Sequence, residues 1–235
     1  MGVKRPQKTP NFRESIGCYP SRVVGQLPLQ CSCGSLRGVV AGVTPRRSNR
    51  LVCMCDDCQT YAHWLGRAAE VLDPHGGTEV VQVTPAMLQI TEGIEHLQCA
   101  RLSPKGLHRW YAACCKTPLA NTLGAKMPFV GIIHLALRSG DDAMPSDADI
   151  GPILARVNAR FGHGAVGADA HARAPFGFIL RSIGKLARDA LHRAHRPSPF
   201  FDDKGDPVVE PTVLSKQARL EAKARCGPVQ SVRER

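Results

Sequence analysis

Short apolar runs separated by turn residues fill the chain from residue 28 to residue 138. Glycine-containing turns such as Gly76-Gly77 and Glu92-Gly93 punctuate these runs. Repeated short strands with turn signals between them are typical of an antiparallel β-sandwich or barrel. We therefore predict a mainly β domain over residues 28–138. Its expected strands lie within Leu36 to Val43, Glu79 to Thr84, Met87 to Ile90, Ile94 to Leu102 and Phe129 to Leu137.

The spacing of apolar residues becomes helical beyond Ser139. One short amphipathic helix is predicted from Ile153, Leu154, Val157 and Phe161. A longer apolar stripe steps by three or four residues through Phe176, Ile179, Ile183, Leu186, Ala190 and Ala194. Such a stripe can lie on an anionic membrane. We expect it instead to pack on the β domain, or on a partner subunit of a homo-oligomer. A last exposed helix is predicted over Thr212 to Arg225.

The domain organisation follows from these changes of pattern. The chain has 235 residues, which at about 150 residues per domain allows one main domain and an appendage. Residues 1–27 are expected to be a flexible basic lead-in, and residues 28–138 the β domain. Residues 145–225 are expected to form a C-terminal α-helical extension, followed by a disordered tail over residues 226–235.

The net charge of +11 is concentrated outside the β domain. Residues 1–50 carry +8, residues 51–145 carry −2 and residues 146–235 carry +5. Aromatic residues make up only 5% of the chain and are not interleaved with the basic ones. A basic protein attracts nucleic acid and other acidic surfaces, but this arrangement does not favour a specific nucleic-acid interface.

The longest apolar run, from Phe129 to Leu137, is nine residues and contains His134. It is too short to span a membrane. No apolar run follows the basic residues at the start of the chain, so we expect no secretory signal and a cytoplasmic location. In a reducing compartment, clustered thiols are more often metal ligands or catalytic groups than disulfides.

Ten cysteines are the unusual feature of the composition, and eight of them fall between Cys31 and Cys115. Buried apolar cysteines have no reason to recur as C-x-C, C-x-C-x-x-C and C-C. Two thiols at positions i and i+2 of an extended segment point to one face and can share a metal ion. All-thiolate tetrahedral sites suit zinc or iron–sulfur clusters, and we favour zinc. Cys18 and Cys226 stand apart from these groups.

Counting thiols divides the cluster into two expected zinc sites. Cys31 and Cys33, with the pair Cys114 and Cys115, supply three or four ligands and close a structural site. Cys53, Cys55 and Cys58 supply only three. A zinc ion held by three protein ligands keeps a position for water or substrate, as catalytic zinc does. A substrate thiol that binds there does so as the thiolate.

These motifs resemble a known family in their order: C-x-C-G, then C-x-C-x-x-C, then an Arg-aromatic stretch ending in Cys-x-Thr-x-Leu. Over residues 28–138 the chain is similar to the glutathione-dependent formaldehyde-activating enzymes, a family that includes the centromere protein V domain. The resemblance implies a β-tent, an antiparallel β-sandwich related to zinc ribbons. It also implies a structural zinc on Cys31, Cys33 and Cys115, and a catalytic zinc on Cys53, Cys55 and Cys58.

The chain departs from the pattern of that family at three positions. Ala112 stands where the family has the first late cysteine, Lys116 where it has a glycine, and Met54 where it has a histidine. The fourth ligand of the structural zinc is therefore open between Cys114 and Cys99. The long C-terminal extension also lies outside the family domain.

The resemblance implies the activity of S-(hydroxymethyl)glutathione synthase, a carbon–sulfur lyase. The expected partners are a glutathione-like small thiol and formaldehyde or a similar small aldehyde. His63, five positions after Cys58 on a predicted helix, is a candidate proton relay. Candidate residues for binding the carboxylates of the thiol, or for lining its pocket, are Arg101, Lys105, Arg109, Asn121 and Thr122.

Two other functions compete with the lyase. The first is a non-enzymatic zinc module that scaffolds a protein or nucleic-acid partner through its basic flanks, in which case binding would fall steeply with salt. The second is a thiol redox protein that uses Cys114 and Cys115. Adjacent cysteines form a strained disulfide poorly, so we rank it last.

Overall fold

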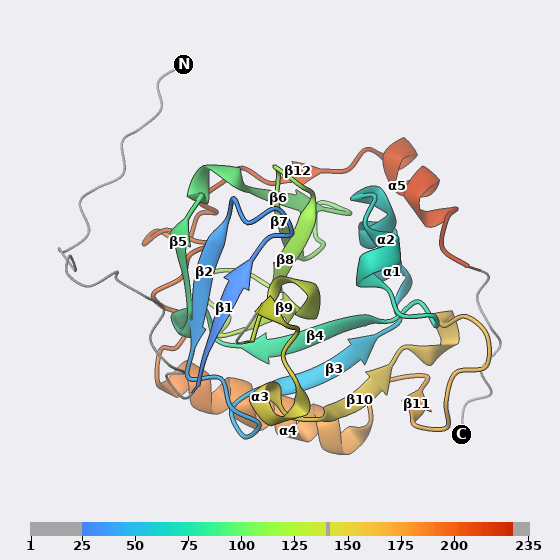
Figure 1. The fold of residues 1–235 in the computed structure, drawn as a ribbon, viewed down its shortest axis with the longest axis horizontal. Coiled ribbons are helices and arrows are strands. Elements are labelled where there is room, and N and C mark those ends of the chain that lie inside the picture. Colours follow the sequence, from blue (N-terminus) through green and yellow to red (C-terminus); the bar gives the residue numbers. More distant parts are fainter. Residues whose placement is uncertain (1–24, 140–141, 228–235) are drawn as a thin grey trace.

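Two β-sheets enclose one apolar core in the computed structural model, which describes residues 25–139 and 142–227 (Figure 1). The smaller sheet has three antiparallel strands in the order β1-β2-β5. These strands are β1 (Gln26–Gln30), β2 (Arg37–Ala41) and β5 (Leu88–Glu92). Their inward side chains, such as Leu29, Val40 and Leu88, join the core formed with the larger sheet.

The larger sheet has nine strands in the order β11-β10-β3-β4-β9-β8-β7-β6-β12. Its six central strands pair antiparallel. They are β3 (Asn49–Cys53), β4 (Thr78–Val83), β9 (Val130–Ile133), β8 (Thr117–Thr122), β7 (His108–Ala112) and β6 (Leu97–Arg101). The edges are parallel additions from the C-terminal half, β10 (Ile153–Val157), β11 (Ala170–His171) and β12 (Thr212–Val213). The protein is therefore mainly β, with a mixed rather than purely antiparallel sheet.

All five predicted apolar runs contain most or all of a strand, namely β2, β4, β5, β6 or β9. Alternation of buried and exposed side chains is clear in β2 and fails in β8, where all six residues are buried. The five predicted runs do not include β1, β3, β7 or β8.

One predicted helix is wrong. Ile153, Leu154, Val157 and Phe161 belong to strand β10 and a following 3-10 turn, η5 (Ala159–Phe161). Ala155 and Val157 are buried and Leu154 is exposed, so the burial follows the two-residue period of a strand. The segment is a strand rather than a helix because it pairs with β3, which lies about a hundred residues earlier in the chain.

The C-terminal extension does contain two of the expected helices. α4 (Phe176–Leu191) lies along one edge of the molecule, near β3 and β10, and α5 (Lys216–Lys223) lies beside α1 (Asp56–Trp64) (Figure 1). The other helical segments are α2 (Ala68–Val71), α3 (Asp147–Ile150), η1 (Pro85–Met87), η2 (Ile94–His96) and η3 (His134–Ala136). The extension is thus a mixture of helices and edge strands that completes the larger sheet.

The apolar face of α4 was expected to pack on the β domain or on a partner subunit, and it does not pack on the β domain of its own chain. Phe176, Leu180 and Ile183 are 79%, 59% and 57% exposed. Within the described ranges, the structure contains no helix with the length and apolar character needed to cross a membrane. Most of the basic lead-in and of the tail lies outside the described residues, as does Cys18; strand β1 begins within the lead-in, at Gln26.

α1 is attached to the larger sheet by aromatic packing. Tyr61 and Trp64 of α1 contact Tyr111 of β7 in a small cluster separate from the main core. Since Cys53 ends β3 and Cys55 and Cys58 begin α1, this packing fixes the point at which the strand passes into the helix.

Gly93 holds the turn before β6 against the loop of the first two cysteines, and its substitution should be costly. Its φ is +69°, and a Cβ there would lie 1.9 Å from the backbone oxygen of Ser35. Gly66 has a similar φ of +71° with nothing near its Cβ position. We expect Gly66→Ala to lower the free energy of unfolding by about 1–2 kcal/mol, the cost of the left-handed backbone. Gly93→Ala should cost more than about 3 kcal/mol, because a backbone clash is added.

Urea denaturation of the two zinc-loaded variants and the wild type measures this difference. Equal losses of stability in the two variants would show that the turn is not held against the cysteine loop.

Candidate metal centres

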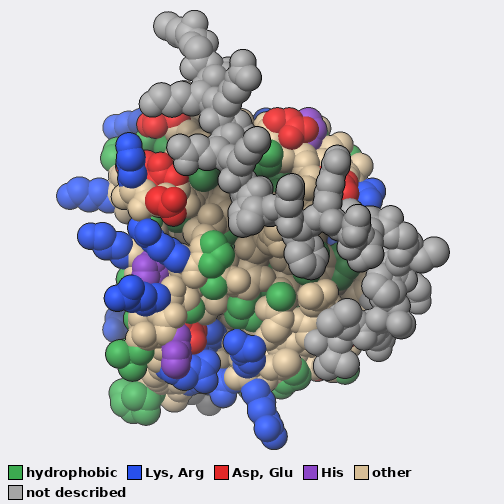
Figure 2. All heavy atoms as spheres, turned by 90° about the vertical axis from the view of Figure 1, so that its left-hand side faces the viewer, with side chains coloured by type: hydrophobic (Ala, Val, Ile, Leu, Met, Phe, Trp, Pro, Cys, Tyr) green, Lys and Arg blue, Asp and Glu red, His purple; other side chains and the backbone are tan. Residues whose placement is uncertain are grey.

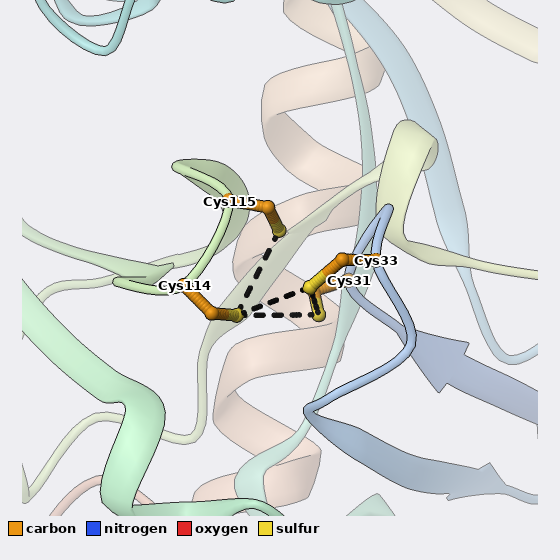
Figure 3. Close-up of side chains that lie close together, drawn as sticks. All are labelled: Cys31, Cys33, Cys114 and Cys115. Atoms are coloured by element: carbon orange, nitrogen blue, oxygen red, sulfur yellow. Dashed lines mark hydrogen bonds between the residues drawn. The ribbon is translucent and has the colours of Figure 1, made fainter.

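Four thiols converge where the two sheets meet. Cys31 and Cys33 follow β1 in the smaller sheet, and Cys114 and Cys115 lie in the turn between β7 and β8 of the larger sheet. Figure 3 shows their sulfurs pointing toward one another from these two loops. The Cys33 Sγ to Cys114 Sγ distance is 3.3 Å, Cys31 Sγ to Cys33 Sγ is 3.5 Å, and Cys31 Sγ to Cys114 Sγ is 3.7 Å.

These separations match the edges of a thiolate tetrahedron. Zinc–sulfur bonds of about 2.3 Å place the ligand sulfurs about 3.8 Å apart. Cys115 Sγ lies 3.8 Å from Cys114 Sγ, and all four sulfurs lie within 4.8 Å of one another. The four sulfurs are therefore close enough together to hold one tetrahedral metal ion.

The backbone explains how adjacent cysteines can share one site. Lys116 has a φ of 58°, in the left-handed region that favours glycine. The formaldehyde-activating enzymes, which the cysteine motifs resemble, have a glycine at this position. The turn that Lys116 makes lets Cys114 and Cys115 approach the same point. Gly34 turns the first loop in the same way, with a φ of +74°, and the amide of Leu36 donates to Cys31 Sγ at 3.3 Å.

The choice between Cys99 and Cys114 as fourth ligand is resolved by position. Cys99 lies on β6, fully buried in the main apolar core, and belongs to neither thiol group. Cys114 is exposed and close to Cys31 and Cys33. Hydrogen bonding with Ser35 lowers the pKa of the exposed Cys33 thiol to about 6, so one ligand of this group is ionised at neutral pH.

The second group contains Cys53, Cys55 and Cys58, whose sulfurs also lie within 4.8 Å of one another. Cys55 is the N-cap of α1, and its Sγ accepts a hydrogen bond from the amide of Cys58 at 3.4 Å. Asn158, in the turn after β10, donates from Nδ2 to Cys53 Sγ at 3.3 Å. Such hydrogen bonds from outside a metal site orient its ligands and stabilise their charge.

A buried cation lies against this second group. Arg109 on β7 is 3% exposed, and its Nη1 is 4.0 Å from Cys58 Sγ and 3.4 Å from Asn121 Oδ1. Its guanidinium carbon lies 5.1 Å from the centre of the Tyr61 ring. Across residues 25–139 and 142–227, no carboxylate forms an ion pair with Arg109.

A buried guanidinium needs a countercharge, because an unpaired charge in the interior is strongly unfavourable. Cys58 is the group placed to provide it. Hydrogen bonds from Cys53 and then Cys55, with the charge of Arg109, hold the pKa of Cys58 well below its usual range. The pKa of Cys55 is raised by its hydrogen bonds to Cys53 and Cys58 and by burial. The charge of Arg109, 4.0 Å from Cys58 Sγ, therefore favours the thiolate form of Cys58.

The remaining candidates from the sequence are less closely grouped. His63 is half-buried on α1, and its ring is not among the atoms within 4.8 Å of the three sulfurs. Burial lowers the pKa of His63, with smaller effects from the charges of Arg225 and His163. Arg101 donates to the Gly106 carbonyl oxygen, and Lys105 is exposed at the same turn. Thr122 accepts a hydrogen bond from the Trp110 indole.

The role of Asn158 was not anticipated, and Arg109 was considered only as a carboxylate-binding residue. The one sequence feature that accompanies the burial of Arg109 is the apolar run from Trp110 to Ala113 directly after it. No comparable signal marks Asn158, whose φ of 61° places it in a turn that only the fold brings to Cys53.

The C-terminal helix covers the helix that carries Cys58. Arg219 of α5 forms an ion pair with Asp57 at 3.2 Å, and Lys223 forms one with Asp56 at 2.7 Å. Cys226 lies outside both thiol groups, with its Sγ 3.7 Å from Thr60 Oγ1.

Metal content per chain tests the division into two groups. We expect two zinc ions in the wild type and one in each of Cys33→Ser and Cys55→Ser, because each variant removes a ligand from one group only. Cys226→Ser, a cysteine outside both groups, should keep two. Elemental analysis of the purified full-length proteins measures this. One zinc in the wild type, or loss of both ions in a single variant that remains folded, would contradict two independent sites.

Removal of the buried cation should weaken only the second site. Arg109→Met leaves the negative charge of the thiolates without its partner, and we expect zinc affinity there to fall by about 10- to 100-fold, as for other outer-shell partners. Zinc affinity at the second group should fall less in Arg109→Lys. It should stay at the wild-type value in Arg101→Met, which replaces an arginine away from both groups. Chelator competition resolves the two sites. Equal affinities in Arg109→Met and the wild type would remove the charge argument.

Comparisons with known proteins name no chemistry for this chain. No curated protein matches the chain. A solved structure of a Rhodobacter sphaeroides protein is 14% identical, covers 54% of this chain and 96% of its own, and has a TM-score of 0.37, too low to support a conclusion. The model of a family of unknown function, DUF6151, matches residues 21–212. The chain belongs to the family DUF6151.

Proposed function

We propose that the protein is a zinc-dependent carbon–sulfur lyase that adds a small thiol to formaldehyde or a similar small aldehyde. The observation that supports this is the unequal count of thiols in the two groups. Four sulfurs fill a tetrahedron in the first group, whereas the second has only three beside a buried arginine. A closed site stabilises structure, and a three-ligand site keeps a place for substrate.

A zinc ion at the second group would lower the pKa of a bound thiol and polarise an aldehyde oxygen. The chain itself supplies the charge balance. Three thiolates and a divalent ion carry one net negative charge, and Arg109 offsets it from its buried position against Cys58. Asn158 and the amide of Cys58 hold two of the three ligands in place.

The proposed reaction is an addition without oxidation or reduction. The thiol sulfur forms a bond to the aldehyde carbon, the carbonyl π bond breaks, and the proton of the thiol ends on the new hydroxyl oxygen. Binding both reactants at one point replaces their encounter in solution, which is a large contribution for a two-substrate step. His63 lies on α1 outside the thiol group, and it is our candidate for carrying this proton through a water molecule.

The order of the cysteine motifs supports a glutathione-like thiol as the first substrate, through their resemblance to the formaldehyde-activating enzymes. The same chemistry would be available to any small thiol that reaches the second group. The competing function is a zinc module that scaffolds nucleic acid or a protein. It gives the buried Arg109 no role.

The rate at which glutathione and formaldehyde equilibrate tests the proposal. Zinc-loaded protein should accelerate formation of the S-hydroxymethyl adduct, followed by exchange NMR. Cys55→Ser should abolish the acceleration and Cys226→Ser should keep it. An unchanged rate with fully zinc-loaded protein, together with duplex DNA binding that weakens steeply with salt, would favour the scaffold instead.

A further inference from the structure

α4 is an amphipathic helix with its apolar face turned outward. Phe176, Leu180, Ile183 and Leu191 are spaced to fall on one face, and they are 79%, 59%, 57% and 84% exposed. Ala187 continues the stripe between Ile183 and Leu191 and is also exposed. Large apolar side chains collected on one exposed face mark an interaction site rather than ordinary surface.

The inner face of α4 is held by polar contacts beside the half-buried Phe178 and Leu186, whereas its larger apolar stripe is exposed. Arg181 donates from Nε to Asn49 Oδ1 at 2.7 Å, and Asn49 Nδ2 is 3.5 Å from Ser182 Oγ. Asp189 is 7% exposed and pairs with Lys185 at 2.5 Å. Polar contacts with the start of β3 thus orient the helix so that its apolar stripe points away from the body.

Positive charge accompanies this stripe. Residues 171–200 contain six arginines and lysines against one aspartate, a net charge of +5 with histidines neutral. Arg181, Arg188 and His192 follow one flank of the apolar stripe and are exposed. A hollow of about 370 Å³ beside them is lined by Arg47, Lys185, Arg188 and His192 and by one acidic residue, Asp189, which pairs with Lys185 and Arg188.

Figure 2 shows the wider charge distribution on the side of the molecule at the left of Figure 1. Lys and Arg side chains gather over one half of this face, with hydrophobic side chains at its lower edge. A second hollow, lined in part by Lys126, His195, Arg196 and Lys204, adds further cationic groups just beyond the end of α4.

We propose that α4 binds the surface of an anionic lipid bilayer, lying in its plane with the apolar stripe among the acyl chains. Apolar side chains on one side and Arg and Lys along the flank are the features of helices that bind in this way. The basic hollows would receive lipid phosphates and carboxylates at headgroup level. A second copy of the chain fits less well, because pairing of two α4 stripes would bring two segments of charge +5 together.

Binding of the full-length, zinc-loaded protein to vesicles tests this. We expect flotation with vesicles of phosphatidylcholine and phosphatidylserine, and little with phosphatidylcholine alone. The double substitution Leu180→Ser and Ile183→Ser should reduce partitioning by at least about tenfold, because both side chains lose apolar burial. Ile94→Ser is the matched control. Ile94 is 52% exposed in η2, away from α4, and its substitution should leave the partitioning to vesicles unchanged.

A second readout separates insertion from simple charge attraction. Phe176→Trp should show a blue-shifted emission with anionic vesicles only, and the shift should persist in part when salt screens the charges. Three results would overturn the proposal: no flotation with anionic vesicles, equal flotation of the double variant, or a dimer in sedimentation velocity that the double variant dissociates.

Discussion

Convergence of four sulfurs from two sheets is the constraint on which the rest of the structure depends. Cys31 and Cys33 belong to the loop after β1, and Cys114 and Cys115 to the turn after β7, so a metal ion held between them would tie the two sheets together. Gly93, in the turn before β6, packs against the backbone of Ser35 and Leu36 in the loop that follows Cys33. The second group of thiols lies apart from this junction, at the end of β3 and the start of α1.

The second group differs from the first in its electrostatics as well as its count. Cys33 and Cys114 are exposed, so solvent can stabilise charge on the first group. Cys58 is buried, and Arg109 takes the place of solvent by lying 4.0 Å from its sulfur. A buried cation with no carboxylate partner in the described chain is explained if the three cysteines act as an anion. Under the proposed function, a metal ion held by these three thiolates would keep one coordination position for a substrate thiol.

Local sequence pattern predicted the parts of the fold that are decided locally. The five apolar runs became strands, and the C-x-C and C-x-C-x-x-C spacings identified all three cysteines of the second group and two of the first. Features that depend on distant partners were missed. β10 is a strand because β3 pairs with it. The sequence left the fourth ligand of the first group open between Cys99 and Cys114, and only the fold shows that Cys99 lies in the core whereas Cys114 lies beside Cys31 and Cys33. The outward face of α4 reflects polar contacts to Asn49 that no periodicity reveals.

The sulfur coordination of the bound zinc tests the central claim most directly. One ion with four sulfur ligands and one with three give an average of about 3.5 sulfurs per zinc in X-ray absorption of the fully loaded protein. Addition of a small thiol should raise that average to about 4, because the thiol sulfur takes the open position. An average of four sulfurs before any thiol is added, or no change afterwards, would contradict an open second site.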